Sequence, residues 1–350
     1  MAYTTINKST DYFNTKLYSG NGTTNHNITG VGFQPDLVWT KGRSGSYGVS
    51  NHKLADAVRG AGNIIHANLS DAQYDQSGTT GATIGFISDG FTLGTNSNSN
   101  NSSTEYVSWN WKAGTTGSGN TGGSGTYKAY SYSVNTTAGF SIVKYVGNGT
   151  GGHTIPHHLG VAPSNVIIKD ISASNSWICK MKGYSGYLYL NNTDAGTSNS
   201  TWLPTDANNL TLANTWGAYN TNDATYIAYC FAEKTGYSKF GSYTGNGSTD
   251  GAFIYTGFKP SFILIKRYDS GSNNWLILDN KRDPINQMGN GLFPNLTGGV
   301  GTGYNCDFLS NGFKWRLSGS GENRTDFGYI YMAFAEAPLV GSNNVPCTAR

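Results

Sequence analysis

Aromatic and aliphatic residues occur in short runs separated by segments rich in Gly, Asn, Ser and Thr, and one such run lies late in each third of the chain. In these runs, 106–111, 226–231 and 329–334, large apolar side chains alternate with smaller ones. A period of two is typical of a β-strand with one face on a core. We expect that face to carry Val107, Trp109, Trp111, Ile227, Tyr229, Phe231, Ile330, Met332 and Phe334.

An earlier run in each third, at 37–40, 166–168 and 262–265, has its apolar residues on consecutive positions. Such a run predicts a strand that is covered on both faces. Taken together, the two kinds of strand predict a set of side chains that are almost fully buried. This set is Trp39, Trp111, Ile167, Phe231, Leu264 and Phe334.

Two short motifs recur in the same order before each closing run. A Tyr-x-Gly-Asn-Gly motif begins at Tyr18, Tyr145 and Tyr243, and a later Gly-x-x-Pro motif is followed, six residues after its proline, by Lys41, Lys169 and Lys266. The opening tyrosine precedes the tyrosine of the closing run by 88, 81 and 86 residues (106−18, 226−145 and 329−243). Ordered landmarks at matching distances indicate internal repetition. The predicted fold is all-β, with three internally repeated β-sandwich-like domains of about 100 residues each.

The motifs and the composition divide the chain into six segments. We expect an N-terminal arm at 1–11, repeat 1 at 12–112, a Gly/Ser/Thr linker and lead-in strand at 113–137, repeat 2 at 138–234, repeat 3 at 237–338 and a C-terminal tail at 339–350. The residues 113–126 are nearly all Gly, Ser and Thr, which is typical of a flexible linker.

Local signals add a few turns and one helical segment. Asn21-Gly22, Asp89-Gly90 and Asn311-Gly312 are dipeptides that favour tight β-hairpin turns. The segment 54–59, followed by Gly60, is the least β-like part of repeat 1, and we expect one or two helical turns there.

Composition and charge exclude several classes of protein. Charged residues make up 12% of the chain and the net charge is +3, with no block of Lys or Arg, so we expect no nucleic-acid partner. No apolar run is long enough to span a membrane, and the first eleven residues lack the apolar core of a signal peptide. Synthesis in a cytosol follows, and the four cysteines, which have no CxxC spacing, are expected to be free thiols: Cys179, Cys230, Cys306 and Cys347.

No recognisable catalytic motif is present, so the sequence predicts neither an enzyme nor a cofactor. Paired carboxylates for glycoside cleavage remain an alternative, because their spacing in the fold cannot be inferred from sequence. His153, His157 and His158 form the one histidine cluster, and it is either a metal site on an oligomer axis or a group of polar loop residues. Lys41, Lys169 and Lys266 are expected to be solvated or to guard strand edges.

Two further groups of residues are candidates for a function. Asp56 and Arg59 in repeat 1 have counterparts in Asp279 and Arg282 of repeat 3, and they form either a local salt bridge at a turn or a ligand-facing pair. Repeat 2 has no such pair and carries Tyr184, Tyr187 and Tyr189 in its place. Tyrosines on loops rich in Gly, Ser and Asn are typical of a binding surface, although packing between the repeats is the alternative.

The sequence resembles a family of tail-fibre-like or structural virion proteins of tailed, mostly marine, bacteriophages. The residues that carry this resemblance are 2–9, 12–18, 32–36, 56–60, 88–91, 107–114, 229–234 and 243–247, which span most of the chain. The resemblance implies a virion protein that is assembled in the host cytoplasm, with other virion proteins as partners. It supplies no catalytic residues.

From the residues and the resemblance together we expect a tail-fibre or adsorption module for host recognition, binding a host surface glycan or protein. A capsid-decoration, knob or tail-adaptor protein with no binding role is the first alternative, and a glycan depolymerase is the second. We expect no membrane insertion. We expect the protein to form a homo-oligomer in the particle.

Overall fold

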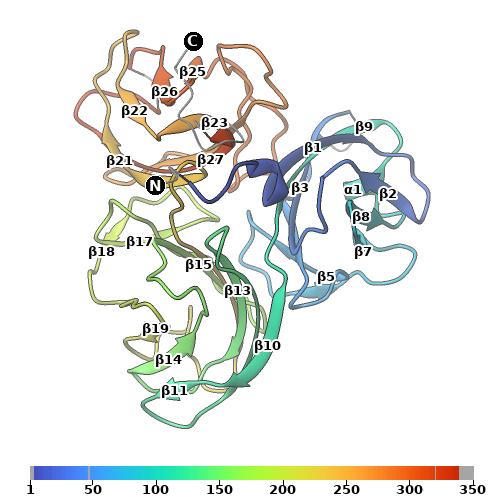
Figure 1. Cartoon of the computed structure of the whole chain (residues 1–350), viewed down its shortest axis with the longest axis vertical. Coiled ribbons are helices and arrows are strands. Elements are labelled where there is room, and N and C mark those ends of the chain that lie inside the picture. The colour runs from blue at the N-terminus through green and yellow to red at the C-terminus, as the bar shows by residue number, and fades with distance from the viewer. Residues whose placement is uncertain (1–3, 46–47, 320, 339–350) are drawn as a thin grey trace.

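The computed structural model describes residues 4–45, 48–319 and 321–338, and it is almost entirely built of antiparallel β-sheets (Figure 1). The predicted all-β class is confirmed. Two short helical segments occur in this part of the chain, the 3-10 turn η1 (Ser9–Asp11) and α1 (Ser97–Asn100). We describe the sheets as three units: unit 1 (residues 12–112), unit 2 (113–234) and unit 3 (237–338).

The strands of unit 1 are β1 (Phe13–Ser19), β2 (His26–Thr29), β3 (Leu37–Gly45), β4 (Lys53–Asp56), β5 (Asn63–His66), β6 (Tyr74–Asp75), β7 (Thr83–Ile87), β8 (Gly90–Leu93) and β9 (Thr104–Trp111). Those of unit 2 are β10 (Thr115–Asn120), β11 (Gly122–Gly123), β12 (Ala129–Asn135), β13 (Phe140–Val146), β14 (His153–Pro156), β15 (Asn165–Asp170), β16 (Ile178–Lys180), β17 (Gly186–Tyr189), β18 (Thr197–Ser198), β19 (Asn209–Leu212) and β20 (Thr225–Phe231). Those of unit 3 are β21 (Ser238–Thr244), β22 (Phe253–Tyr255), β23 (Phe258–Arg267), β24 (Leu276–Asp279), β25 (Cys306–Leu309), β26 (Gly312–Trp315) and β27 (Gly328–Pro338).

Each unit has one large and one small sheet, and the strand orders of the large sheets correspond. The large sheets contain the orders β1-β9-β3-β4, β13-β20-β15-β16 and β21-β27-β23-β24. The small sheets are β2-β8-β7, β11-β14-β19 and β22-β26-β25. In each unit the closing strand lies between the opening strand and the strand that carries the repeated lysine. That the three units superpose closely stays a prediction.

Two layers of side chains form the core of each unit. The outer face of each large sheet packs on its small sheet; in unit 1, for example, Val38 and Tyr106 cluster with Ile28 and Phe91. The small residues of the closing strands, such as Ala228 and Cys230, lie in this layer and are fully buried. The three units are therefore β-sandwiches in the sense of two packed sheets.

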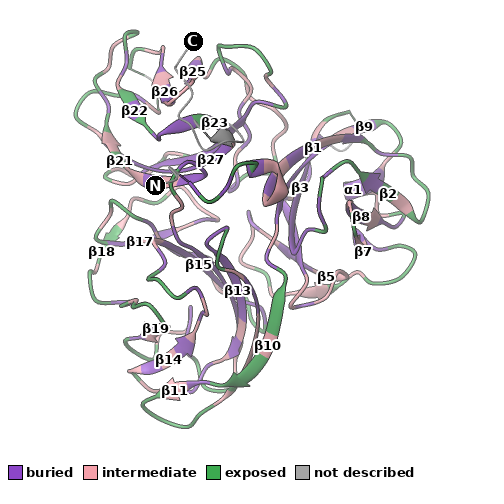
Figure 2. Ribbon diagram, viewed as in Figure 1, coloured by how far each residue is buried: buried purple, intermediate pink, exposed green. Residues whose placement is uncertain are grey.

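The inner faces of the three large sheets meet in one central cluster, visible as buried strands where the units join (Figure 2). Phe13 of unit 1 stacks on Phe334 of unit 3 with ring centroids 4.9 Å apart, and Phe231 of unit 2 lies 6.1 Å from the same ring. The alternating residues that were expected to face a core all belong to this cluster. The six side chains predicted to be almost fully buried are between 1% and 6% exposed, so that prediction is confirmed.

The segment predicted to be a flexible linker is instead an edge strand. β10 pairs with β12 over six residues, which extends the large sheet of unit 2. Gly117 lies under the ring of Tyr132 and Gly119 under that of Tyr130, so these aromatic rings cover positions that have no side chain of their own. The prediction was wrong because a strand is held by backbone hydrogen bonds, which a Gly- and Ser-rich sequence can still make.

Two local predictions also fail. The segment 54–59 forms no helix: Lys53–Asp56 is strand β4, paired with β3, because Leu54 and Ala55 are buried on opposite faces of the sheet. Asn21-Gly22 is not a hairpin turn, since β1 pairs with β9 whereas β2 pairs with β8 in the other sheet. By contrast, Asp89-Gly90 and Asn311-Gly312 do lie at hairpins, β7–β8 and β25–β26.

The described part of the N-terminal arm packs between units 1 and 3. Ile6 lies in the central cluster, and the Ser9 hydroxyl donates to the backbone oxygen of Glu336. The arm therefore contributes to the core instead of extending away from it. The predicted tail, residues 339–350, lies outside the described residues.

Candidate functional site

A buried asparagine holds the Tyr-x-Gly-Asn-Gly turn in every unit. Asn100, Asn220 and Asn323 are fully buried, and each accepts through Oδ1 the backbone N–H of the turn asparagine, at 2.9, 3.1 and 3.1 Å. The side-chain amide donates to two backbone carbonyls, which are those of Thr150 and Asn214 in unit 2. The repeated motif is thus a corner between sheets that is pinned by a distant side chain.

A stacked pair of tyrosines completes this corner. The opening tyrosine lies against the first tyrosine of the closing strand in each unit, with ring centroids 5.1, 5.2 and 4.8 Å apart. The hydroxyl of the opening tyrosine donates to the backbone oxygen of the residue just before the buried asparagine, at Ser99, Tyr219 and Glu322. The most strongly repeated residues of the chain therefore serve the scaffold.

Sequence reasoning missed these asparagines, although a signal was present. Each lies six residues before the closing tyrosine (106−100, 226−220 and 329−323). Asparagine is so frequent in this chain that the spacing alone did not single them out.

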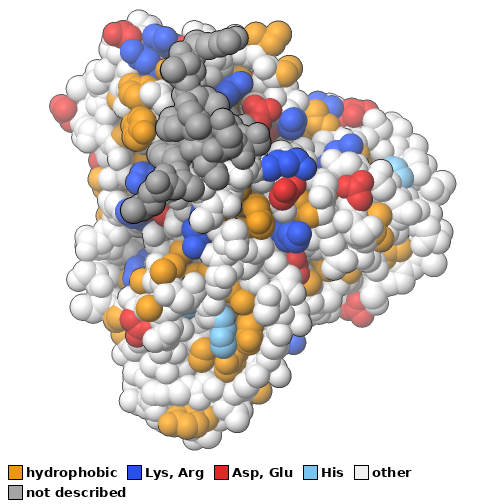
Figure 3. All heavy atoms as spheres, viewed as in Figure 1, with side chains coloured by type: hydrophobic (Ala, Val, Ile, Leu, Met, Phe, Trp, Pro, Cys, Tyr) orange, Lys and Arg blue, Asp and Glu red, His pale blue; other side chains and the backbone are white. Residues whose placement is uncertain are grey.

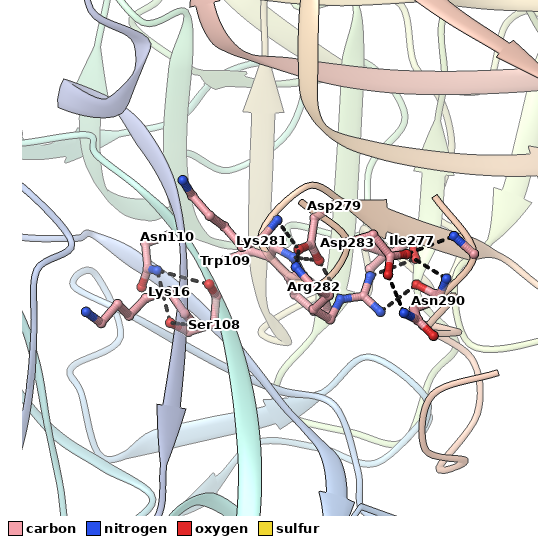
Figure 4. Close-up of polar contacts among 11 residues, drawn as sticks. Lys16, Ser108, Trp109, Asn110, Ile277, Asp279, Lys281, Arg282, Asp283 and Asn290 are labelled. Carbon is pink, nitrogen blue, oxygen red and sulfur yellow. Dashed lines mark hydrogen bonds and ion pairs between the residues drawn. The ribbon is translucent and has the colours of Figure 1, made fainter. Parts of the chain in front are cut away.

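The two Asp-x-x-Arg pairs form salt bridges, and both are buried. Arg59 Nε donates to Asp56 Oδ2 at 2.5 Å, and Arg282 Nε donates to Asp279 Oδ2 at 2.6 Å (Figure 4). The remaining guanidinium nitrogens donate to backbone carbonyls, which are those of Ile277 and Asn290 in unit 3. The local salt bridges predicted from the spacing are present, and they are buried because each pair lies against a neighbouring unit.

Each aspartate accepts one hydrogen bond from the unit beside it. Tyr229 of unit 2 donates its hydroxyl to Asp56 Oδ2 of unit 1 at 2.8 Å. Trp109 of unit 1 donates its indole N–H to Asp279 Oδ2 of unit 3 at 3.1 Å, with the two side chains facing each other in Figure 4. Trp109 and Tyr229 occupy matched positions on β9 and β20, two residues before Trp111 and Phe231.

Unit 2 lacks an aspartate at the matched position, and unit 3 lacks the donor. In the register of the sheets, Met181 of unit 2 takes the place of Asp56 and Asp279. Met332 of unit 3 takes the place of the donors Trp109 and Tyr229. Met181 and Met332 both lie in the central cluster, 1% and 2% exposed. The loss of the Asp-x-x-Arg pair in repeat 2 is thus matched by an apolar residue in its neighbour.

The repeated lysines are buried, which contradicts the expectation that they are solvated or guard an edge. Lys41 donates to the backbone oxygens of Gly42 and Gly48 in its own unit and of Thr297 in unit 3. Lys266 of unit 3 reaches the backbone oxygen of Thr193 in unit 2 at 3.1 Å. Burial lowers the pKa of Lys41 to about 7 and that of Lys266 to about 8.

A third set of contacts joins the units through ring nitrogens. Trp177 of unit 2 donates to the backbone oxygen of His66 in unit 1, and Trp275 of unit 3 donates to that of Tyr189 in unit 2, both at 2.8 Å. His52 is the matched residue of unit 1; it accepts the indole N–H of Trp39, and burial lowers its pKa well below the ordinary value. The two tryptophan contacts therefore join unit 1 to unit 2 and unit 2 to unit 3, whereas the His52 contact stays within unit 1.

The histidine cluster does not converge. His153 bonds Asn220 and Thr121, His157 lies 3.1 Å from the backbone oxygen of Asp206, and His158 stacks on Tyr132 with ring centroids 3.7 Å apart. His153 and His157 are fully buried. Within the described residues no group of three or more His, Cys, Asp or Glu side chains is placed to hold a metal ion.

The three tyrosines of unit 2 have different surroundings. Tyr184 packs on Tyr268 of unit 3, with ring centroids 4.8 Å apart, and borders the central cluster. Tyr187 and Tyr189 are half-buried on β17, and Tyr187 also contacts Trp216 at 4.9 Å. The structure therefore separates an inter-unit residue, Tyr184, from a partly exposed aromatic group formed by Tyr187, Tyr189 and Trp216. A binding role for them stays a prediction.

The three described cysteines, Cys179, Cys230 and Cys306, are free and buried, whereas Cys347 lies outside the described residues. Burial raises the pKa of all three described thiols. They are therefore unreactive core residues.

Comparison with known proteins gives one match. Residues 8–338 match the family described as a domain of unknown function (DUF7483), so the chain belongs to that family. No curated protein and no solved structure matches it significantly. No helix in the described part of the chain is long and apolar enough to cross a membrane.

Proposed function

We propose that this protein is a structural component of a bacteriophage particle that acts as a tail-fibre or adsorption module for host recognition. The observation that carries the proposal is that most of the repeated ionisable groups are buried in contacts between the units. The two Asp-x-x-Arg pairs, Lys41 and Lys266 are all buried in contacts that join one unit to the next. Groups that an enzyme would present to a substrate are here part of a rigid scaffold.

Further support comes from how this scaffold is joined. Polar contacts across a buried interface fix how two units are placed against each other. A shifted arrangement would leave a buried polar group unpaired, which costs free energy. A rigid body of three units suits a particle component that must present loops at fixed positions. The phage-like sequence segments 2–9, 12–18 and 107–114 add the resemblance to virion proteins.

The test has two arms. Protein mass spectrometry of purified particles should find this chain at a fixed copy number, and the labelled recombinant protein should bind host cells in a saturable way. A chain that is in the particle but does not bind cells would favour a decoration or adaptor role. Release of reducing ends from host envelope would favour a depolymerase, and absence from the particle would overturn the proposal.

A further inference from the structure

The outer strand of the small sheet in unit 3 differs from its counterparts in one respect. β22 pairs with β26 as β2 pairs with β8 and β14 with β19, so Ile254 corresponds to Ile28 and Ile155. All three isoleucines are buried, between 0% and 6% exposed. The inward side of this strand is therefore the same in every unit.

The outward side changes. The residues that flank the isoleucine are Asn27 and Thr29 in unit 1, Thr154 and Pro156 in unit 2, and Phe253 and Tyr255 in unit 3. Phe253 is 46% exposed and Tyr255 is 58% exposed. Folding does not require aromatic rings here, because the same strand forms without them twice in the same molecule.

The two rings lie on a small, open surface. Residues two apart on a strand point to the same face, and the Phe253 ring lies against Gly312 of β26, which has no side chain to cover it. In unit 2, β11 pairs with the matched strand, whereas β22 is an end strand of its sheet. Figure 3 shows hydrophobic side chains exposed over the position that β22 has in Figure 1.

Charged side chains beside the rings form a balanced network. Lys314, the cross-strand partner of Phe253, is 2.6 Å from Asp250, and Arg316 bonds Asp307 at 2.6 Å and approaches Asp250 at 3.4 Å. Two positive and two negative groups leave no net charge to attract an ionic ligand. The Asp250 side chain is 77% exposed, so its carboxylate can accept hydrogen bonds from a ligand.

We propose that Phe253 and Tyr255, with Asp250 and Lys314 beside them, bind a neutral saccharide; this rests on the proposed recognition function and gives it a site and a ligand class. Aromatic faces contact the apolar side of a sugar ring, and the neighbouring carboxylate and ammonium exchange hydrogen bonds with its hydroxyls. A protein partner fits less well, because two rings supply at most about 300–500 Å². A stable protein interface needs about 800 Å² on each side.

The site can be tested with a variant that copies unit 1. Phe253→Asn with Tyr255→Thr gives β22 the outward residues of β2, so folding should be retained and Tm unchanged. The matched control is Tyr127→Thr, since Tyr127 is a 61% exposed tyrosine elsewhere on the surface. The probes are cellohexaose, maltohexaose and mannohexaose, with hexagalacturonate as the acidic comparison, followed by saturation-transfer NMR and titration.

We expect the unmodified protein and the control to bind at least one neutral hexasaccharide, and the double variant to lose affinity at least tenfold. Binding of none of the neutral probes, binding of hexagalacturonate alone, or equal affinity in the double variant overturns the proposal. A host-cell binding assay distinguishes failure of this saccharide site from failure of the proposed recognition function. If the double variant binds cells like the unmodified protein, recognition stands and this site is wrong; if hexasaccharides bind but cells do not, the site stands and host recognition fails.

Discussion

Trp109 of unit 1 donates its indole N–H to the Asp279 carboxylate of unit 3 over 3.1 Å, and both side chains are buried. The same carboxylate accepts hydrogen bonds from Arg282 Nε and from the backbone N–H groups of Lys281 and Arg282. At the matched places unit 2 has Met181 and unit 3 has Met332, and both lie in the central cluster. At this position each unit therefore has either a buried aspartate with its donor or an apolar side chain, which avoids an unpaired buried charge.

Asp279→Met should destabilise the protein by about 3–5 kcal/mol, because it leaves the Arg282 guanidinium buried without its carboxylate. Urea unfolding gives the free energy. Asp11→Asn, which breaks the exposed Lys8–Asp11 pair, is the control and should cost less than about 1 kcal/mol. Equal effects of the two substitutions would mean that the buried pair does not hold the units together.

Asn220→Ala should cost about 2–4 kcal/mol, because it leaves the Asn148 N–H and two carbonyls without partners. The exposed Asn98 provides the comparison, and its replacement by Ala should change the unfolding free energy by less than about 0.5 kcal/mol. A loss below about 1 kcal/mol for Asn220→Ala would show that the corner does not depend on this side chain.

Tyr184→Ser and Tyr187→Ser should lower Tm to different extents. Tyr184 packs on Tyr268 between units 2 and 3, so its removal should lower Tm. Tyr187 is half-buried at the surface, and its removal should lower Tm less. If Tyr184→Ser keeps its Tm and abolishes host-cell binding, Tyr184 is a recognition residue and its packing role is wrong.

Stability should fall as the pH drops below about 6.5, the ordinary histidine value. Burial lowers the pKa of His52 well below that value and that of His66 to about 4. Between the folded and unfolded pKa values the unfolded chain binds more protons, so the contribution of these histidines to stability is full above pH 6.5 and is lost as the pH falls. The slope is about 1.4 kcal/mol per pH unit for each such histidine. Urea unfolding at pH 7.5 and 5 measures it, and equal values would refute it.

Stability should rise from pH 7.5 to 9.5. Burial lowers the pKa of Lys41 to about 7 and that of Lys169 and Lys266 to about 8, whereas unfolded lysine titrates near ~10.4. In that window the unfolded chain binds more protons, so raising the pH favours the folded state. Lys41→Met should reduce the rise, and a decrease in stability over this range in the unmodified protein would count against buried lysines.

The alternating strands could be predicted because burial acts on every second side chain and leaves a trace in the sequence. Trp111, Phe231 and Phe334 were placed correctly for that reason. β10 left no such trace, since this strand is exposed at every position but Gly117 and is held by backbone hydrogen bonds to β12. Its glycine content is the same as that of a flexible linker, so composition alone predicted a linker.

The candidate site was harder to predict, because the contacts that define it join units far apart in sequence. The Asp56–Arg59 ion pair could be inferred from the i, i+3 spacing, but its burial depends on Tyr229, 173 residues from Asp56. Lys41 looked like an exposed strand end for the same reason: the Thr297 carbonyl that it reaches belongs to unit 3. The aromatic pair Phe253 and Tyr255 could not be identified from sequence, because only the sheet register aligns these residues with Asn27 and Thr29.

We propose that this chain belongs to a phage particle, and a reconstruction of that particle tests this central claim most directly, because it would show where the three units lie. We predict density for this chain on the tail, at a surface that meets the host, with the Phe253 and Tyr255 side of unit 3 facing outward. Density on the capsid shell, or on the tail with β22 buried against another virion protein, would contradict the assignment of this protein as a host-recognition module.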